Sequence, residues 1–403
     1  MTAFLALVAF CSPMAAIFLS ILLFPHGRKP LSCALGIGFA AAVGFYYLRT
    51  GLDADIVRHM EYLSFYKGLG FLQCFDAGHY QTLYVWDAWN WLIAQIGDPY
   101  LLQASAAFVN YSIISYIVFD AARGSSASQS KTALYWLIAI SAISPMALVV
   151  GIRSGTSCMV AALALYRGYA KSRSCFETLA LLLVSILIHH SALLFLMAWL
   201  LAPLCQKQPL KVCAIVFAAF LGIAAVSTVL LTYFPAGGNP LNSFVHSVLA
   251  GVVDTAEGDE WSTTHAGSFN TKVNTLWSLF LIASFGLSIW KKTEKSGRFE
   301  GGFGAVLAAA AVISACSAAL MIVFPINGGR PLPVVCLLAI SCLLHYGCQV
   351  SSAGAMRYDL FDALVIAASA GEFLLHAYSL MYGGTEVWSL LAGFLMGFFT
   401  SIL

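Results

Sequence analysis

The run Leu179–Leu204, LALLLVSILIHHSALLFLMAWLLAPL, is apolar on both sides of a central polar trio, His189-His190-Ser191. In hydrocarbon only helices or closed barrels satisfy their own backbone groups. The run lacks the short alternating pattern of barrel strands, so it indicates helix. It therefore predicts either two membrane crossings that meet at the polar trio, or a segment that dips into the membrane and returns.

The rest of the 403-residue chain has the same character. Hydrophobic residues make up 60 % and charged residues 9 %, with a mean hydropathy of +0.85, whereas soluble domains carry about 25 % charged residues. So few charges cannot coat a soluble particle of this size. We expect a single integral membrane domain over residues 1–403, with an all-α fold formed by a polytopic bundle of about 11–13 spans.

Apolar runs of suitable length for a span recur along the whole sequence. They are Ala3–Phe24, Leu31–Leu48, Pro99–Phe119, Thr132–Val150, Ile152–Ala170, Leu179–Leu204, Val212–Leu231, Val273–Trp290, Phe303–Phe324, Pro331–His345, Ala363–Met381 and Val387–Leu403. The net charge of +2 offers no basic field for nucleic acid. The eleven cysteines contain no C-x-x-C, so neither a zinc site nor a disulfide framework is indicated.

Basic residues in short loops set the expected orientation, because such loops remain in the cytoplasm. Six short connectors hold 14 of the 20 Lys and Arg residues, and they are His26–Lys29, Arg123–Lys131, Arg167–Arg173, Lys207–Lys211, Lys291–Arg298 and the stretch around Arg357. All six face the cytoplasm only if Tyr80–Ile96 does not cross and Leu179–Leu204 either crosses twice or dips and returns. The N-terminus is then outside, the C-terminus is cytoplasmic, and two outer loops cover about 49–98 and 233–272. The alternative, with two ordinary crossings, places Arg123–Lys131 and Arg167–Arg173 outside.

Two arginines on the predicted outer side are candidates for anion binding. Arg153 lies in VVGIRSG (149–155) and Arg330 in PINGGRP (325–331), each beside glycine and between two spans. A guanidinium is costly near a membrane unless it is paired or hydrated, and its planar fork suits phosphate. Either these side chains reach lipid headgroups, or they clamp a pyrophosphate at the outer leaflet.

The remaining candidates lie on the same predicted side. His189 and His190 could transfer protons or contact phosphate, or simply hydrogen-bond a neighbouring helix. Asp53-Ala54-Asp55 opens the first outer loop, where a carboxylate could cap the following helix or contact sugar, and Arg58 follows in the same segment. No metal site is expected, because there is no H-E-x-x-H and no Cys partner for the histidines.

In this order the motifs resemble the EpsG-like and Wzy-type bacterial polysaccharide (O-antigen) polymerases. The resemblance is clear over about residues 45–200, and in the C-terminal half it extends only to the general order of features. The segments that carry it are Gly51-Leu52-Asp53, Asp76-Ala77-Gly78-His79-Tyr80, Ile152-Arg153-Ser154, Arg167–Arg173, His189-His190-Ser191-Ala192-Leu193 and the later Arg330. Ser154 stands where the family usually has Gln, and His59 stands near a position where Tyr is common.

The resemblance implies a GT-C-like bundle with two periplasmic loop regions, in the inner membrane of a bacterium. It implies transfer of an undecaprenyl-pyrophosphate-linked glycan chain onto a new lipid-linked repeat unit at the outer face, with inversion and without nucleotide or cofactor. A membrane protein that regulates chain length would be a further partner. An O-antigen ligase, a transporter or flippase of lipid-linked sugars, and a structural scaffold are the alternative readings.

The resemblance also implies a role for each candidate residue. Arg153 and Arg330 would bind the pyrophosphate. His189 would be the first candidate for the general base or a third phosphate contact, and Asp55 the second candidate for the base. The residues expected to hold sugar, fix the loop or otherwise bind substrate are Arg58, Asp53 and His190.

Overall fold

The computed structural model of the protein is helical throughout its described part, which contains no β-strand. The described residues are 2–23, 29–49, 55–76, 82–125, 127–143, 148–149, 151–233, 245–246, 269–296, 301–323, 329–349, 360–382 and 387–398. Most of the predicted outer loop 233–272 lies outside these residues, and so does Asp53.

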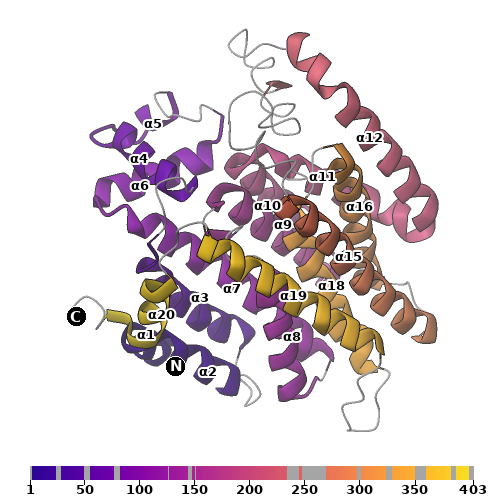
Figure 1. Ribbon diagram of the computed structural model, residues 1–403, viewed down its shortest axis with the longest axis horizontal. Coiled ribbons are helices and arrows are strands. Elements are labelled where there is room, and N and C mark those ends of the chain that lie inside the picture. The colour runs from indigo at the N-terminus through magenta and orange to yellow at the C-terminus, as the bar shows by residue number, and fades with distance from the viewer. Residues whose placement is uncertain are drawn as a thin grey trace.

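The body of the molecule is a bundle of helices, shown in Figure 1. Its helices are α1 (Thr2–Cys11), α2 (Pro13–Leu23), α3 (Pro30–Tyr46), α7 (Tyr100–Ser125), α8 (Gln129–Ala142), α9 (Ile152–Ala170), α10 (Cys175–Ile188), α11 (Leu193–Lys207), α12 (Pro209–Tyr233), α15 (Phe269–Ser296), α16 (Gly301–Val323), α18 (Leu332–Gln349), α19 (Leu360–Tyr382) and α20 (Val387–Met396). Each predicted span overlaps one of these helices, except for two spans that are divided.

The first divided span is Ala3–Phe24, which consists of α1 and α2 with Ser12 between them. Pro13 begins α2, and a proline inside a helix removes one backbone donor and clashes with the preceding turn. Hydrogen bonds from Ser12 N to Val8 O (2.7 Å) and from Ala16 N to Ser12 O (3.2 Å) continue across the junction. The expectation of one unbroken helix is therefore corrected to two helices that meet at Pro13.

The second divided span is Leu179–Leu204, where the chain reverses direction. The end of α11 returns to the end of α9: the Tyr169 hydroxyl donates to the carbonyl of Trp199, and Gln206 Nε2 donates to the carbonyl of Gly301 at 3.2 Å. The next residue, Gly302, lies so close that a Cβ there would be 2.2 Å from the carbonyl oxygen of Tyr169. The start of α10 and the end of α11 thus lie at one end of the bundle, with the polar trio at the other, an arrangement that fits both a double crossing and a segment that dips and returns.

Charged residues lie near both ends of helix α9, so the length of the helix separates them. Near its C-terminal end, Lys171 Nζ lies 2.8 Å from Asp120 Oδ2, and Arg167 Nη2 lies 2.8 Å from Glu177 Oε1. Arg153 lies in its first turn, roughly 25 Å away at 1.5 Å per residue. The basic connector Arg167–Arg173 and the arginine of the candidate site therefore occupy opposite ends of the bundle.

A separate group of short helices lies at one end of the bundle, at the upper left of Figure 1. It consists of α4 (Asp55–Tyr66), α5 (Gln73–Asp76) and α6 (Tyr84–Ile96). In α6 the polar residues Asp87 and Asn90 are buried, whereas Tyr84 and Leu92 are exposed. Asp87 accepts a hydrogen bond from the Tyr66 hydroxyl at 2.6 Å. Trp86 and Ile93 are buried as well, so α6 packs a mixed polar and apolar face, and the interfacial position expected for Tyr80–Ile96 stays a prediction.

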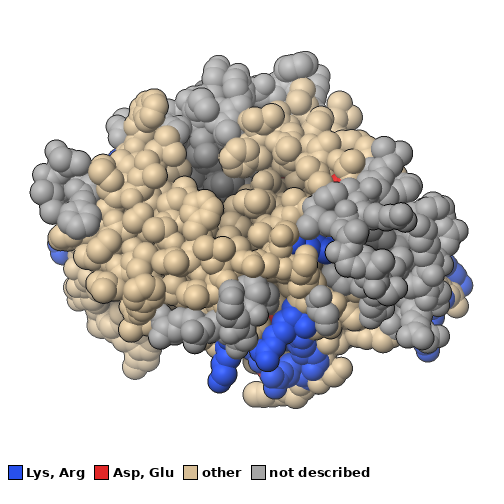
Figure 2. Space-filling view, turned by 90° about the horizontal axis from the view of Figure 1, so that it is seen from below, with Lys and Arg blue, Asp and Glu red and all other residues tan. Residues whose placement is uncertain are grey.

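The described surface in Figure 2 is largely uncharged; the largest group of Lys and Arg side chains lies at the lower middle of the view, and others lie at its edges. Among the described residues, three helices are long and apolar enough to cross a membrane by length and composition: Tyr100–Ser125, Pro209–Ser227 within α12, and Gly301–Ile322 within α16. Large apolar side chains such as Leu210 and Trp388 are exposed. Exposed large apolar side chains, together with these apolar helices, indicate contact with lipid, and the chain is a helical membrane-associated protein.

Candidate functional site

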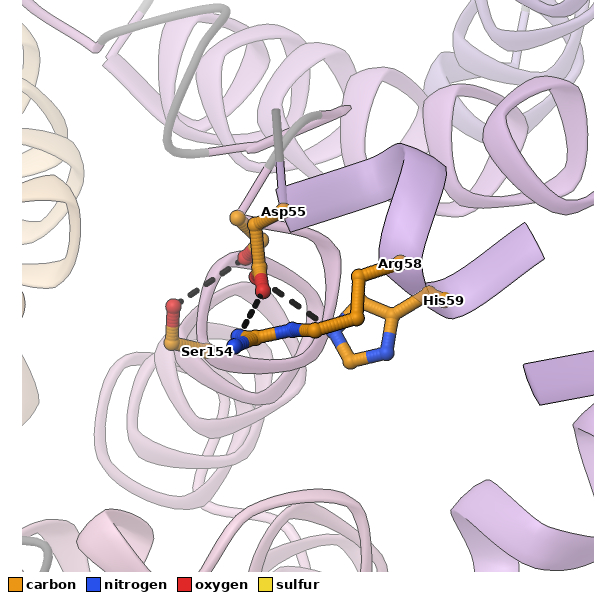
Figure 3. Close-up of polar contacts among 5 residues, drawn as sticks. Asp55, Arg58, His59 and Ser154 are labelled. Carbon is orange, nitrogen blue, oxygen red and sulfur yellow. Dashed lines mark hydrogen bonds and ion pairs between the residues drawn. The ribbon is translucent and has the colours of Figure 1, made fainter. Parts of the chain in front are cut away.

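The first turn of α4 carries an acid held by two basic side chains (Figure 3). Arg58 Nη2 contacts Asp55 Oδ1 at 2.5 Å, and His59 Nε2 lies 3.3 Å from Asp55 Oδ2. Positions i, i+3 and i+4 share one helix face, so the helix itself brings these groups together. Arg58 is half-exposed, whereas His59 is buried. The carboxylate at this helix N-terminus is thus fixed from both sides.

The first turn of α9 carries Arg153, and buried polar contacts hold the chain before it. Asn110 Nδ2, from α7, donates to the carbonyl of Leu148 at 2.7 Å and to Thr156 Oγ1 at 3.2 Å. The Ser154 hydroxyl donates to the carbonyl of Gly151 at 3.0 Å, the contact at Ser154 in Figure 3. The backbone on both sides of Arg153 is therefore attached to the bundle.

Arg330 reaches the same region from the start of α18. The Cys158 thiol, in the second turn of α9, donates to the Arg330 carbonyl at 3.4 Å. Cys158 is five residues beyond Arg153, which is about 7–8 Å along the helix axis. The two arginines, 177 positions apart in the sequence, are therefore held beside the same two turns of α9.

The polar trio forms the turn between α10 and α11. His189 ends α10 in an extended conformation, and the 3₁₀ turn His190–Ala192 follows. The backbone N–H of Ser191 donates to His189 Nδ1 at 3.2 Å, and Ser191 Oγ lies 2.7 Å from the same nitrogen. His189 is thus the N-cap of the short turn, a position where a side-chain acceptor satisfies a backbone donor.

Electrostatic interactions connect these three elements into one cluster. Burial lowers the pKa of His189 well below its usual value, and the positive charges of Arg153 and Arg330 lower it further. Asp55 acts on His189 in the opposite direction. His189 is therefore neutral at pH 7 and lies within electrostatic range of both arginines and of the carboxylate.

The acid of the cluster is ionised. Burial by itself raises the pKa of the Asp55 carboxyl, but the contact with His59 opposes this. The positive charges of Arg58 and Arg153 add to the effect of His59, so the pKa of Asp55 lies below its usual range. Burial in turn lowers the pKa of His59. Near pH 7 the cluster therefore combines a carboxylate, guanidinium groups and neutral imidazoles.

His190 faces a different group from its neighbour. Its Nε2 lies 3.1 Å from Thr82 Oγ1, just before α6. Burial lowers the pKa of His190, as does the charge of Arg153. His190 therefore connects the α10–α11 turn to the outer helices while remaining close to Arg153.

The structure brings together the sequence-predicted residues that it describes. Asp55, Arg58, Arg153, His189, His190 and Arg330 lie in or next to one cluster. Asp53 lies outside the described residues. Sequence reasoning did not single out His59, Ser191 or Thr82 for a role. Only His59 carried a usable signal, its i, i+4 spacing from Asp55, because the contacts of the other two depend on the turn and on tertiary packing.

The chemistry of this cluster is that of an anion site with a fixed acid nearby. Arginine forks bind phosphate oxygens by paired hydrogen bonds, and a carboxylate can accept a proton from a hydroxyl. Within the described ranges no three His, Cys, Asp or Glu side chains are grouped as a metal site requires.

No known protein family, curated protein or solved structure matches the chain.

Proposed function

We propose that the protein is a membrane glycosyltransferase of the polysaccharide polymerase type. It transfers a polyprenyl-pyrophosphate-linked glycan chain onto a lipid-linked repeat unit at the outer face of the bacterial cytoplasmic membrane. The observation that carries the proposal is that the Cys158 thiol, in the second turn of α9, donates to the Arg330 carbonyl, which brings Arg330 to the turns of α9 that carry Arg153. Two arginines at one end of the bundle suit a bound pyrophosphate.

The reaction requires the protein to stabilise the leaving group and to accept a proton from the acceptor hydroxyl. The acceptor hydroxyl attacks the anomeric carbon of the donor, the bond from that carbon to the phosphate oxygen breaks, and polyprenyl pyrophosphate leaves with its electrons. Arg153 and Arg330 stabilise the negative charge that develops on the leaving oxygen, which is the largest kind of contribution in many enzymes. The acceptor proton passes to a base, and a single displacement inverts the anomeric carbon.

Asp55 is the second candidate to take that proton, after His189, because the contacts that lower its pKa also lower its basicity. It is ionised at pH 7, and Arg58 together with His59 fixes its orientation. The N-terminus of α4 carries a partial positive charge, which favours the carboxylate. Arg58, half-exposed beside it, would contact sugar hydroxyls, and His190 would extend the substrate-binding surface.

The test uses the full-length protein in nanodiscs with a purified undecaprenyl-pyrophosphate-linked repeat unit, and the product ladder is measured by gel and mass spectrometry. Arg153→Lys and Arg330→Lys keep the charge but lose the planar fork, so each should lose activity almost as completely as its Ala counterpart. Arg173→Lys, the same substitution at the far end of α9, is the matched control and should retain activity.

Three results would contradict the proposal. The first is a lysine variant at position 153 or 330 with full activity, which removes the bidentate phosphate contact. The second is chain transfer to lipid A core without extension of the repeat unit, which indicates a ligase. The third is movement of labelled lipid-linked sugar across the membrane of a proteoliposome without chain growth, which indicates a transporter.

A further inference from the structure

The hydrogen-bonding pattern at His189 determines which ring nitrogen carries the hydrogen. A neutral imidazole has one donor nitrogen and one acceptor nitrogen. A backbone N–H can only donate, and the N–H of Ser191 points at His189 Nδ1 from 3.2 Å. Nδ1 must therefore be the acceptor, and the hydrogen of the neutral ring lies on Nε2.

The Ser191 hydroxyl also contacts this nitrogen. Its oxygen lies 2.7 Å from Nδ1, and a serine hydroxyl can donate or accept, so this contact fits either tautomer. The backbone N–H of Ser191 is therefore the group that opposes a hydrogen on Nδ1. An imidazolium, or a neutral ring with its hydrogen on Nδ1, would place two donors face to face at this position.

The opposite nitrogen is available for a ligand. In the described part of the chain no hydrogen-bond partner reaches His189 Nε2, since both contacts of the ring are at Nδ1. The ring lies within electrostatic range of Arg153 and Arg330. An N–H donor without a protein partner, in the field of two guanidinium groups, is complementary to an anionic oxygen.

We propose that His189 binds a phosphate oxygen of the donor pyrophosphate through its Nε2–H, and that the backbone N–H of Ser191 fixes this tautomer. The inference rests on the proposed function and sharpens it. A base at His189 would need a lone pair on Nε2 and hence a hydrogen on Nδ1, which Ser191 opposes. His189 therefore does not take the acceptor proton, and that role belongs to Asp55.

The tautomer is measured directly on the full-length protein in nanodiscs, labelled with ¹⁵N-histidine. The His189 signals are assigned by their loss in His189→Gln. Between pH 6.5 and 8, roughly the range above the ordinary histidine pKa, we expect a protonated Nε2 and an unprotonated Nδ1. A protonated Nδ1 overturns the inference and leaves the proposed function standing. Ser191→Ala keeps the backbone N–H, so the hydrogen should stay on Nε2 in this variant as well.

Two substitutions separate the donor role from the capping role. In His189→Gln the amide nitrogen reaches the position of Nε2 but the cap is lost, whereas in His189→Asn the side chain can still cap the turn but no donor reaches that position. Undecaprenyl pyrophosphate in nanodiscs is the probe. The Gln variant should bind it within a few-fold of the wild type, and the Asn variant roughly 10–100-fold more weakly, the loss of one hydrogen bond to a charged group.

The outcomes separate the two claims. If neither variant changes the affinity but both abolish turnover, His189 is the base and the inference is wrong. If the wild type does not bind undecaprenyl pyrophosphate while it does bind the glycan-bearing lipid, the phosphate contact is wrong and the glycosyl transfer stands. If the wild type binds neither, the proposed function fails as well.

Discussion

His190 and Thr82 join the turn between α10 and α11 to the outer helices: Nε2 of His190 lies 3.1 Å from Oγ1 of Thr82, although 108 residues separate them in the chain. The neighbouring His189 instead makes its ring contacts at Ser191. The two adjacent histidines therefore have different partners. One connects the outer helices to the bundle, and the other belongs to the arginine cluster.

Thr82→Val removes this contact while it keeps the shape of the side chain. A single hydrogen bond contributes about 0.5–1.5 kcal/mol to stability, so the melting temperature in detergent should fall slightly. Affinity for undecaprenyl pyrophosphate should stay close to that of the wild type. A loss of affinity as large as that of Arg153→Ala would show that the Thr82 contact organises the anion site itself.

Asp55→Asn should abolish most of the activity. The amide keeps the size of the side chain but cannot take a proton, and loss of a general base costs about 10²–10⁴-fold in turnover. Donor binding, measured with undecaprenyl pyrophosphate, should change far less. Glu61→Gln is the matched control, since Glu61 is an exposed acid on the same helix. An Asp55→Asn enzyme that is as active as Glu61→Gln would remove the carboxylate from the mechanism.

Asn110→Ala should destabilise the protein by about 1–3 kcal/mol, because the buried carbonyl of Leu148 loses its donor. The same change frees the segment before Arg153, so donor affinity should fall together with the melting temperature. Asn110→Asp supplies no amide donor and should not rescue either quantity. Normal thermal stability in Asn110→Ala would mean that another group holds Leu148.

Cysteine accessibility tests the orientation. Cys175 is exposed at the start of α10, at the end of the bundle that the basic connectors place in the cytoplasm. In intact cells an impermeant thiol reagent should not label it, and labelling should appear after permeabilisation and be absent in Cys175→Ser. A cysteine at Lys67, exposed after α4, should react from outside. Labelling of Cys175 in intact cells would reverse the predicted orientation.

Acidification should destabilise the folded protein below about pH 6.5. Burial lowers the pKa of both His59 and His189, so their contribution is complete above the unfolded value near 6.5 and is lost as the pH falls toward their lowered folded values. Melting temperatures in detergent between pH 5 and 8 measure this slope. His59→Gln should flatten the slope, and an unchanged slope would show that His59 does not contribute to it.

The sequence by itself predicted that the surface of this protein faces lipid, and it predicted most of the helices. A charged fraction of 9 % leaves too little polarity for a water-covered surface, and apolar runs in lipid must be helical because no water satisfies their backbone. The polar trio within Leu179–Leu204 marked the turn for the same reason. The break at Pro13 was also readable in principle, because proline interrupts the hydrogen-bond ladder of any helix.

The tertiary structure decided which of these polar groups meet. Arg153 and Arg330 are 177 positions apart, and their common position beside α9 follows from the packing of α16 and α18 against it. No local pattern encodes that distance, since helix packing depends on side-chain shape over many residues. The tautomer of His189 likewise depends on one backbone N–H in a 3₁₀ turn. Periodicity predicts which residues share a helix face, but only the folded chain sets where each donor points.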